Sequence, residues 1–219
     1  MKSISKKEMR KRIRERLASI DFSDLINKSS RLSENFFSWT QQNQNLFLSQ
    51  MQKRYLVSYY PFENEPQLNI EIEGGGEAYG VAYARIQNWK FRQMEAAIAR
   101  REQPGIWEEV ALGDRIKIFQ PDSSQPLCNP DQIAALLVPG LAFTKEGGRL
   151  GRGAGFYDRF LSHYPNALRI GIAFEEQIES TLPLEAHDLS VDILLTDNGI
   201  YRTNSYEEWK NQDRVNSKG

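Results

Sequence analysis

The most constraining feature of this chain is an apolar segment that leads directly into a glycine-rich loop. Residues 133–138 are almost continuously apolar, which is typical of a strand buried on both faces, as in a parallel sheet. The segment ends at Pro139-Gly140, and the loop GGRLGRGAGFYDRF follows from Gly147 to Phe160. Phe156, Phe160 and Leu161 have the spacing of a helix that starts at the end of this loop. Strand, loop and helix in this order predict a ligand site at the carboxyl end of a strand.

The remaining pattern alternates helices with strands. Ser5 and Glu8 predict a capping box ahead of a helix whose apolar residues recur at helical spacing. We expect a second helix over 25–37, strands over 55–60, 79–86, 168–174 and 191–195, and a turn at 197–199 into a last short strand. The segment 91–101 is ambiguous, because its Met, Glu and Ala residues favour a helix by propensity alone. This alternation indicates a layered α/β fold.

Composition limits the class of protein. The 219 residues suffice for one domain, or at most two small ones, and the net charge of -1 argues against bulk electrostatic binding of a polyanion. A single cysteine, Cys128, excludes an internal disulfide, and we expect it to be passive. The sequence has neither a signal-peptide pattern nor an apolar run as long as a membrane span. We therefore expect a soluble, cytoplasmic protein.

The glycine-rich loop has the chemistry of an anion site. Gly151, Gly153 and Gly155 alternate around Arg152, and such glycines can present backbone N–H groups to a phosphate. Arg149 adds a second guanidinium, and Asp158 stands where it could hold Mg²⁺. The loop is neither a Walker A loop nor a dinucleotide fingerprint, so a flexible loop with solvated arginines is the alternative. The combination of groups favours a site for a polyphosphate and a metal.

The segment PGLAFTKEGGRLGRGAGFYDRFL resembles the signature region of the 5-formyltetrahydrofolate cyclo-ligases, also called methenyltetrahydrofolate synthetases. Residues 59–68, 118–121, 169–177 and 182–200 are similar to further segments of that family. The stretch 69–79 departs from it, because it is short and rich in glycine where the family has a longer helix. The matching residues are Pro139, Gly140, Phe143, Gly148, Arg149, Leu150, Gly151, Arg152, Gly153, Gly155, Tyr157 and Asp158.

The resemblance implies a single three-layer Rossmann-like domain over residues 1–202, with a central sheet that is mostly parallel or mixed, and a polar tail over 203–219. It implies an ATP- and magnesium-dependent enzyme that converts 5-formyltetrahydrofolate to 5,10-methenyltetrahydrofolate with release of ADP and phosphate. The partners expected are a reduced folate and ATP, without nucleic acid or membrane, and the chain is expected to act as a monomer.

The resemblance also implies the roles of individual residues. Tyr60, Glu65 and Tyr157 would bind the folate, Asp158 and Asp192 would hold Mg²⁺, and Arg149, Arg152 and Tyr157 would be catalytic. ATP would be bound by Lys6, Arg10, Arg149, Leu150, Gly151, Arg152, Gly153, Ala154, Gly155, Phe156 and Tyr157.

Simpler explanations exist for several of these residues. Lys6 and Arg10 could form a solvated basic helix face, Glu65 could be a turn residue, and Asp192 could be an ordinary polar residue of a strand. His187 and Asp188 receive no acid–base role. For the whole chain, the alternatives are an ATP-dependent relative that acts on a substrate other than folate, and a non-catalytic protein that binds folate or nucleic acid.

Overall fold

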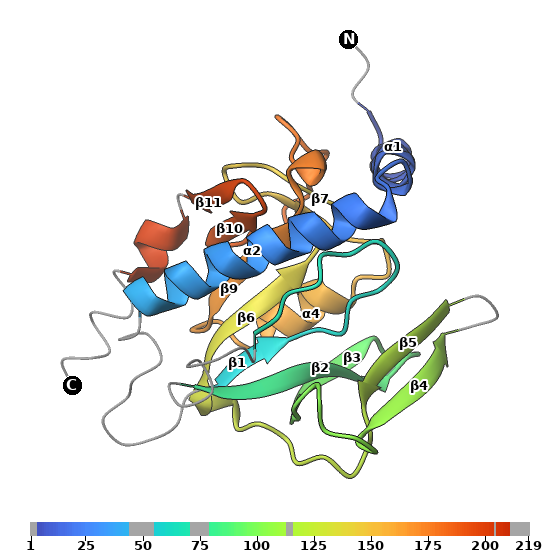
Figure 1. The fold of residues 1–219 in the computed structure, drawn as a ribbon, viewed down its shortest axis with the longest axis vertical. Helices are drawn as coiled ribbons and strands as arrows, with labels where there is room; N and C mark the ends of the chain where they lie inside the picture. Colours follow the sequence, from blue (N-terminus) through green and yellow to red (C-terminus); the bar gives the residue numbers. More distant parts are fainter. Residues whose placement is uncertain (1–3, 44–54, 71–78, 113–115, 204, 211–219) are drawn as a thin grey trace.

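The computed structural model describes residues 4–43, 55–70, 79–112, 116–203 and 205–210. Within these ranges, a seven-stranded sheet has the strand order β11-β10-β9-β6-β1-β2-β3 (Figure 1). The sheet comprises β1 (Tyr55–Ser58), β2 (Gly80–Asn88), β3 (Gln93–Ile98), β6 (Ile133–Pro139), β9 (Leu168–Ala173), β10 (Ile193–Thr196) and β11 (Gly199–Arg202).

The centre of the sheet is parallel and its two edges are antiparallel. Strands β10, β9, β6, β1 and β2 run parallel to one another, while β11 and β3 pair antiparallel with their neighbours. All seven residues of β6 are buried, which confirms the strand predicted from the apolar run. The predicted turn at 197–199 is also confirmed, since β10 and β11 form an antiparallel pair across it. The sheet is therefore mixed but mostly parallel, as the resemblance implied.

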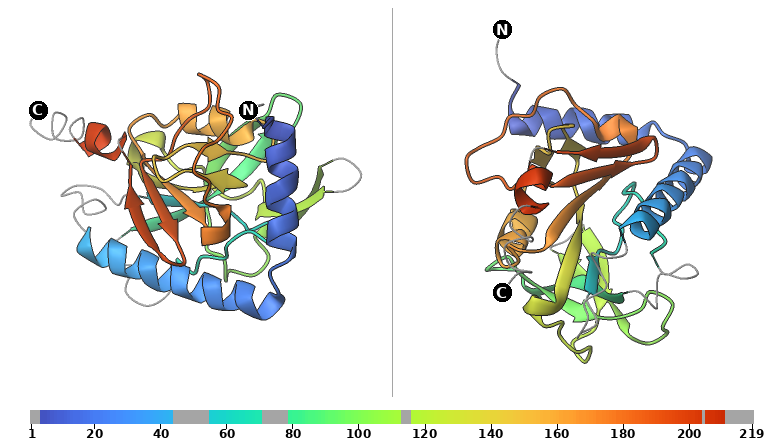
Figure 2. Two further views of the ribbon diagram at one scale, coloured as in Figure 1. Left: turned by 90° about the horizontal axis from the view of Figure 1, so that it is seen from above. Right: turned by 90° about the vertical axis from the view of Figure 1, so that its left-hand side faces the viewer.

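Helices cover both faces of this sheet (Figures 1 and 2). Helix α2 (Phe22–Gln42) packs Leu32, Phe36 and Trp39 on one face, and α4 (Phe156–Ser162) packs Phe160 and Leu161 on the other. Two apolar clusters therefore lie on opposite sides of the sheet and give the domain its three layers. No helix among the described residues is both long and apolar enough to cross a membrane.

Helix α1 (Lys6–Ala18) lies against the glycine-rich loop and the 3-10 turn η3 (Glu175–Gln177). Its capping box is present as predicted: Glu8 N donates to the Ser5 hydroxyl, and Ser5 N donates to the Glu8 carboxylate. Met9, Ile13 and Leu17 are buried in a third apolar cluster that includes Leu141, Leu150 and Phe174. This packing fixes the polar face of α1 beside the loop.

Several elements differ from the predictions. The ambiguous segment 91–101 forms strand β3 instead of a helix, because it pairs with β2 along its length and buries Ala96 and Ala97. The hairpin of β4 (Trp107–Leu112) and β5 (Ile116–Pro121) was not predicted, and neither was the short pair of β7 (Ala142–Phe143) and β8 (Arg149–Leu150). The second helix is longer than 25–37 at both ends.

Part of the predicted polar tail, residues 205–210, is folded against the domain. Residues 205–210 are helical, and Tyr206 is buried in the cluster that also contains Leu32. The Trp209 indole N–H donates to the Asn166 carbonyl over 3.0 Å. The first part of the tail therefore packs on the domain, while residues 211–219 and most of the divergent stretch 69–79 lie outside the described residues.

Candidate active site

A cavity of about 740 Å³ lies at the carboxyl edge of the central strands. It includes the residues that follow β1 and β6, two adjacent parallel strands from which the chain continues to opposite sides of the sheet. Ligands of open α/β sheets bind at such switch points. The cavity is lined by Lys6, Arg10, Arg14, Tyr59, Tyr60, Phe62, Glu63, Glu65, Ala84, Ile86, Trp89, Arg92, Met94, Ile118, Phe119, Pro139, Gly140, residues 149–158, Glu185, His187 and Asp188.

Arg149 lies at the base of this cavity, on the short strand β8. Its Nη2 donates to Asp158 Oδ1 over 2.6 Å and its Nη1 donates to the Pro139 carbonyl over 3.4 Å. The side chain is only 2% exposed, and its Nε is buried without a hydrogen-bond partner among the described residues. A buried donor left unpaired costs about 1–3 kcal/mol, so this guanidinium is oriented but not fully satisfied. An anionic oxygen would supply the missing acceptor.

Helix α1 contributes three cations to the same wall, spaced four residues apart. Arg10 Nε donates to the Gly151 carbonyl over 2.9 Å, and a Cβ at Gly153 would lie only 3.2 Å from the Arg10 guanidinium. The glycine at 153 therefore permits the close approach of helix and loop. Arg14 also lines the cavity, and among the described residues no carboxylate lies within ion-pair distance of it.

Lys6, the third of these cations, faces two carboxylates at the cavity rim. Its Nζ lies 2.7 Å from Asp188 Oδ2 and 3.4 Å from Glu185 Oε1. Burial alone would lower the pKa of Lys6, but its hydrogen bonds and charge interactions with these carboxylates leave that pKa raised. Burial would likewise raise the pKa of Asp188, yet the bonds from Lys6 and from Glu185 N leave it lowered. Both groups are therefore charged near neutral pH.

Arg152 and Glu65 meet in the cavity although 87 residues separate them. Arg152 Nε donates to Glu65 Oε1 over 2.8 Å, and Phe62 N donates to Glu65 Oε2 over 3.1 Å. Burial raises the pKa of Glu65, and the nearby Arg152 charge only partly opposes this effect. The glycine-rich loop is thus joined to the predicted folate-binding segment by an ion pair.

Aromatic rings line the part of the cavity away from the cations. Tyr60 packs against Phe119 of the β4–β5 hairpin at a centroid distance of 5.2 Å. Trp89, which follows β2, packs against Phe156 at 4.9 Å. Tyr157 is half-buried between the two main apolar clusters and faces the Arg149 guanidinium at 5.9 Å. Trp89 and Phe119 were missed in the sequence because the turn and hairpin that present them were not predicted.

The magnesium pair implied by the resemblance, Asp158 and Asp192, stays a prediction. Asp158 lines the cavity, whereas Asp192 is not among the lining residues. Asp192 immediately precedes β10, and its Oδ2 accepts from Arg169 N over 2.8 Å. Asp188 does line the cavity, and Leu189 N donates to Asp158 Oδ1 at 3.5 Å.

The available ligands fit a metal that arrives with phosphate. The described residues contain no group of three or more His, Cys, Asp or Glu side chains that could hold a metal. Mg²⁺ commonly uses one or two carboxylates and completes its coordination with phosphate oxygens and water. Asp158, with Asp188 in the same cavity, fits that pattern, whereas a metal site made by protein groups alone does not.

Replacing Glu65 with Gln should change how stability depends on pH. A raised carboxyl pKa means that the folded state binds more protons than the unfolded state above pH 4.5. The contribution of Glu65 to the unfolding free energy should therefore fall as pH rises from 4.5 to the raised folded-state pKa. The unfolding free energy, measured by urea unfolding across this pH range, should fall less steeply with pH in Glu65→Gln than in the wild type. Gln67→Met, at an exposed neighbouring position that has no ionisable group, is the control and should keep the wild-type slope.

Taken together, the fold and the site define a class of protein. The α/β domain has a loop lined by cations at its switch point, and aromatic residues form the neighbouring wall of the same cavity. Such a cavity is suited to hold a polyanion beside a flat organic molecule. The sequence model of the 5-formyltetrahydrofolate cyclo-ligase family matches residues 84–197, more than half of the chain. The chain belongs to the 5-formyltetrahydrofolate cyclo-ligase family.

Individual relatives agree with this assignment. The mouse 5-formyltetrahydrofolate cyclo-ligase is 24% identical over 87% of this chain and 93% of its own length. The yeast (Saccharomyces cerevisiae) enzyme is 41% identical, but over 32% of this chain and 36% of the yeast protein. The structure of Aquifex aeolicus 5,10-methenyltetrahydrofolate synthetase superposes with a TM-score of 0.68 at 23% identity, covering 92% of this chain and 94% of that one. The structural likeness supports the fold.

Proposed function

We propose that this protein catalyses the ATP-dependent cyclisation of 5-formyltetrahydrofolate to 5,10-methenyltetrahydrofolate, with release of ADP and phosphate. The observation that carries the proposal is that one cavity combines a cationic wall with an aromatic wall, joined by the Arg152–Glu65 ion pair. The family relationship supplies the reaction, and the cavity supplies groups for both reactants. Its volume of about 740 Å³ lies within the range of pockets that bind small molecules and cofactors.

The cationic wall suits the triphosphate of ATP. Lys6, Arg10 and Arg14 approach from α1, and Arg149 offers an unpaired buried Nε at the base. Phosphoryl transfer depends on positioning and charge neutralisation more than on a nucleophilic side chain. These residues supply both, and the backbone of residues 149–157 would hold the phosphates from the other side. Mg²⁺, held by Asp158 and Asp188, would neutralise further phosphate charge.

The aromatic wall suits the folate. Tyr60, Phe119, Trp89 and Phe156 form apolar surfaces against which a pterin ring can stack. Glu65 lies at the edge of this wall, where its carboxylate can accept hydrogen bonds from ring N–H groups. Burial disfavours the ionised form of Glu65 and so raises its pKa. In the free protein, the hydrogen bond and charge of Arg152 partly offset this effect.

The proposed reaction has two steps. The γ-phosphoryl group leaves ADP and bonds to the formyl oxygen, which makes the formyl carbon electrophilic. The second folate nitrogen then attacks that carbon and loses its proton, and the carbon–oxygen bond breaks as phosphate departs. Arg149 would stabilise charge on the transferring phosphoryl group, and Arg152 would connect the phosphate loop with the folate side. Tyr157 lies between the two and would contact both reactants.

A direct assay tests the proposal. Purified protein with ATP, Mg²⁺ and 5-formyltetrahydrofolate should produce the absorbance of the methenyl product, with one ADP formed for each product molecule. Omission of ATP should abolish the signal. Folate binding without turnover would instead identify a binding protein, and ATP hydrolysis without methenyl formation would indicate a different substrate; either result would contradict the proposal.

A further inference from the structure

Gln177 is the last residue of the turn η3. Both the oxygen and the nitrogen of its side-chain amide make hydrogen bonds in the protein interior. Its side chain is fully buried, with 0% exposure. Its Nε2 donates to the Gly140 carbonyl over 2.8 Å and to the Leu141 carbonyl over 3.3 Å, and its Oε1 accepts from Phe174 N over 2.7 Å. One amide thus satisfies three backbone groups that would otherwise be buried without these partners.

The two carbonyls belong to the corner that connects β6 to the cavity. Gly140 lines the cavity, and Leu141 N donates to the Leu150 carbonyl over 2.8 Å, which attaches the corner to the strand that carries Arg149. Pro139, immediately before the corner, supplies the carbonyl that accepts from Arg149 Nη1. A shift of this corner would therefore move Arg149 and the start of the glycine-rich loop.

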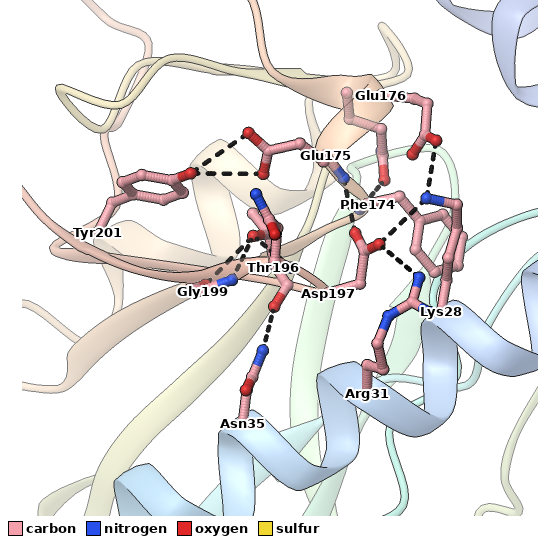
Figure 3. Close-up of polar contacts among 12 residues, drawn as sticks. Lys28, Arg31, Asn35, Phe174, Glu175, Glu176, Thr196, Asp197, Gly199 and Tyr201 are labelled. Atoms are coloured by element: carbon pink, nitrogen blue, oxygen red, sulfur yellow. Dashed lines mark hydrogen bonds and ion pairs between the residues drawn. The ribbon is translucent and has the colours of Figure 1, made fainter.

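The turn that carries Gln177 is itself held from two helices. Figure 3 shows Lys28 and Arg31 of α2 both approaching one carboxylate oxygen of Asp197, its Oδ2. Glu175 N donates to the other oxygen, Oδ1, over 2.8 Å. Lys28 Nζ also lies 2.7 Å from Glu176 Oε1. From the other side, Arg16 of α1 donates to the Glu176 carbonyl over 2.7 Å. Gln177 is consequently fixed relative to both helices and to the sheet.

We infer that Gln177 is a positioning residue for catalysis: it holds the Gly140–Leu141 corner, and through that corner it places Arg149 and residues 149–155 for the phosphoryl transfer. It acts without touching a reactant. This inference rests on the proposed function for its kinetic consequences, but its structural consequence can be measured separately. A displacement of about 1 Å at a reacting group can lower a rate by as much as 10²-fold, so a small movement of the corner is sufficient.

The variant Gln177→Glu tests this inference because its effect can be switched by pH. When ionised, the introduced carboxylate would place a negative oxygen against two carbonyl oxygens and displace the corner, whereas the protonated carboxyl can donate to them. We expect kcat to fall by about 10-fold or more near neutral pH and to return toward the wild-type value as pH is lowered. Gln177→Met, which is neutral and cannot donate, should be impaired to the same degree at every pH. Gln103→Glu, an exposed substitution at a residue that does not line the cavity, should match the wild type throughout.

Hydrogen exchange supplies the readout that does not depend on activity. Near neutral pH, amides of residues 140–155 should exchange faster in Gln177→Glu than in Gln103→Glu, while amides of β9 and β10 should not. The charged and titratable groups around the turn are Arg12, Arg16, Lys28, Arg31, Glu175, Glu176, Glu179, Asp197 and Tyr201, and they are common to all the variants.

The outcomes separate the inference from the proposed function. Recovery of kcat at low pH together with localised exchange supports the inference. A loss of kcat in Gln177→Glu that is independent of pH, or exchange that increases equally over the whole chain, overturns it and leaves only a general structural role. If the wild type has no cyclo-ligase activity, the proposed function fails, and unchanged exchange at 140–155 would then overturn the structural part as well.

Discussion

Replacing Arg149 with Lys should lower kcat by about 10²–10³-fold while the protein remains folded, which is the loss typical of removing one group that stabilises transition-state charge. The Arg149 guanidinium contacts Asp158 through Nη2 and Pro139 through Nη1, and its buried Nε has no hydrogen-bond partner among the described residues. A lysine has one compact ammonium group and cannot make these contacts together. Turnover measured at saturating ATP and folate gives the effect directly.

The matched control is Arg159→Lys. Arg159 lies on α4, next to Asp158 in sequence, but it is exposed and donates to the Phe91 carbonyl outside the cavity lining. It should retain wild-type turnover. A folded Arg149→Lys variant with wild-type kcat would show that this guanidinium has no part in phosphoryl transfer. Circular dichroism and the unfolding midpoint establish that the variant is folded.

Replacing Gly147 with Ala should destabilise the protein by about 3 kcal/mol, from about 1–2 kcal/mol for the left-handed backbone and about 1–3 kcal/mol for steric overlap. Gly147 has φ +97°, and a Cβ there would lie 2.4 Å from the Val191 carbonyl oxygen. That oxygen belongs to backbone, so it cannot rotate away. Gly147 also accepts from Val191 N and donates to the Thr144 carbonyl, in the turn that leads to Arg149.

Gly105→Ala is the control for backbone strain alone. Gly105 has φ +77°, also left-handed, but a Cβ there would meet no atom within 4 Å. We expect Gly105→Ala to lose only about 1–2 kcal/mol in urea unfolding. Equal losses for the two variants would contradict the claim that Val191 makes position 147 intolerant.

Local sequence patterns predicted the elements whose stability is decided locally. The Ser5 capping box and the uninterrupted apolar run of β6 each depend on a few neighbouring residues, and both were predicted correctly. Strand β3 was missed because the propensity of its Met, Glu and Ala residues is weak compared with pairing along β2. The β4–β5 hairpin was missed as well, and with it Phe119.

The candidate site shows the same division between local and distant contacts. Arg149 and Asp158 are nine residues apart on one loop, so their common location could be predicted from the sequence. The contact between Arg152 and Glu65 spans 87 residues, and no spacing pattern encodes it. The folded chain also shows which aspartates line the cavity: Asp158 and Asp188 do, and Asp192 is not among the lining residues.

If this cavity transfers the γ-phosphoryl group of ATP to the formyl oxygen, as we propose, that oxygen must leave with the phosphate. The most direct test uses 5-formyltetrahydrofolate labelled with ¹⁸O in its formyl group, with mass analysis of the phosphate released. We expect one labelled oxygen in each phosphate, formed together with one methenyl product, and loss of both in Arg149→Lys. Methenyl product accompanied by unlabelled phosphate would contradict the proposed transfer, because the formyl oxygen would then have left by a route that does not pass through phosphorylation.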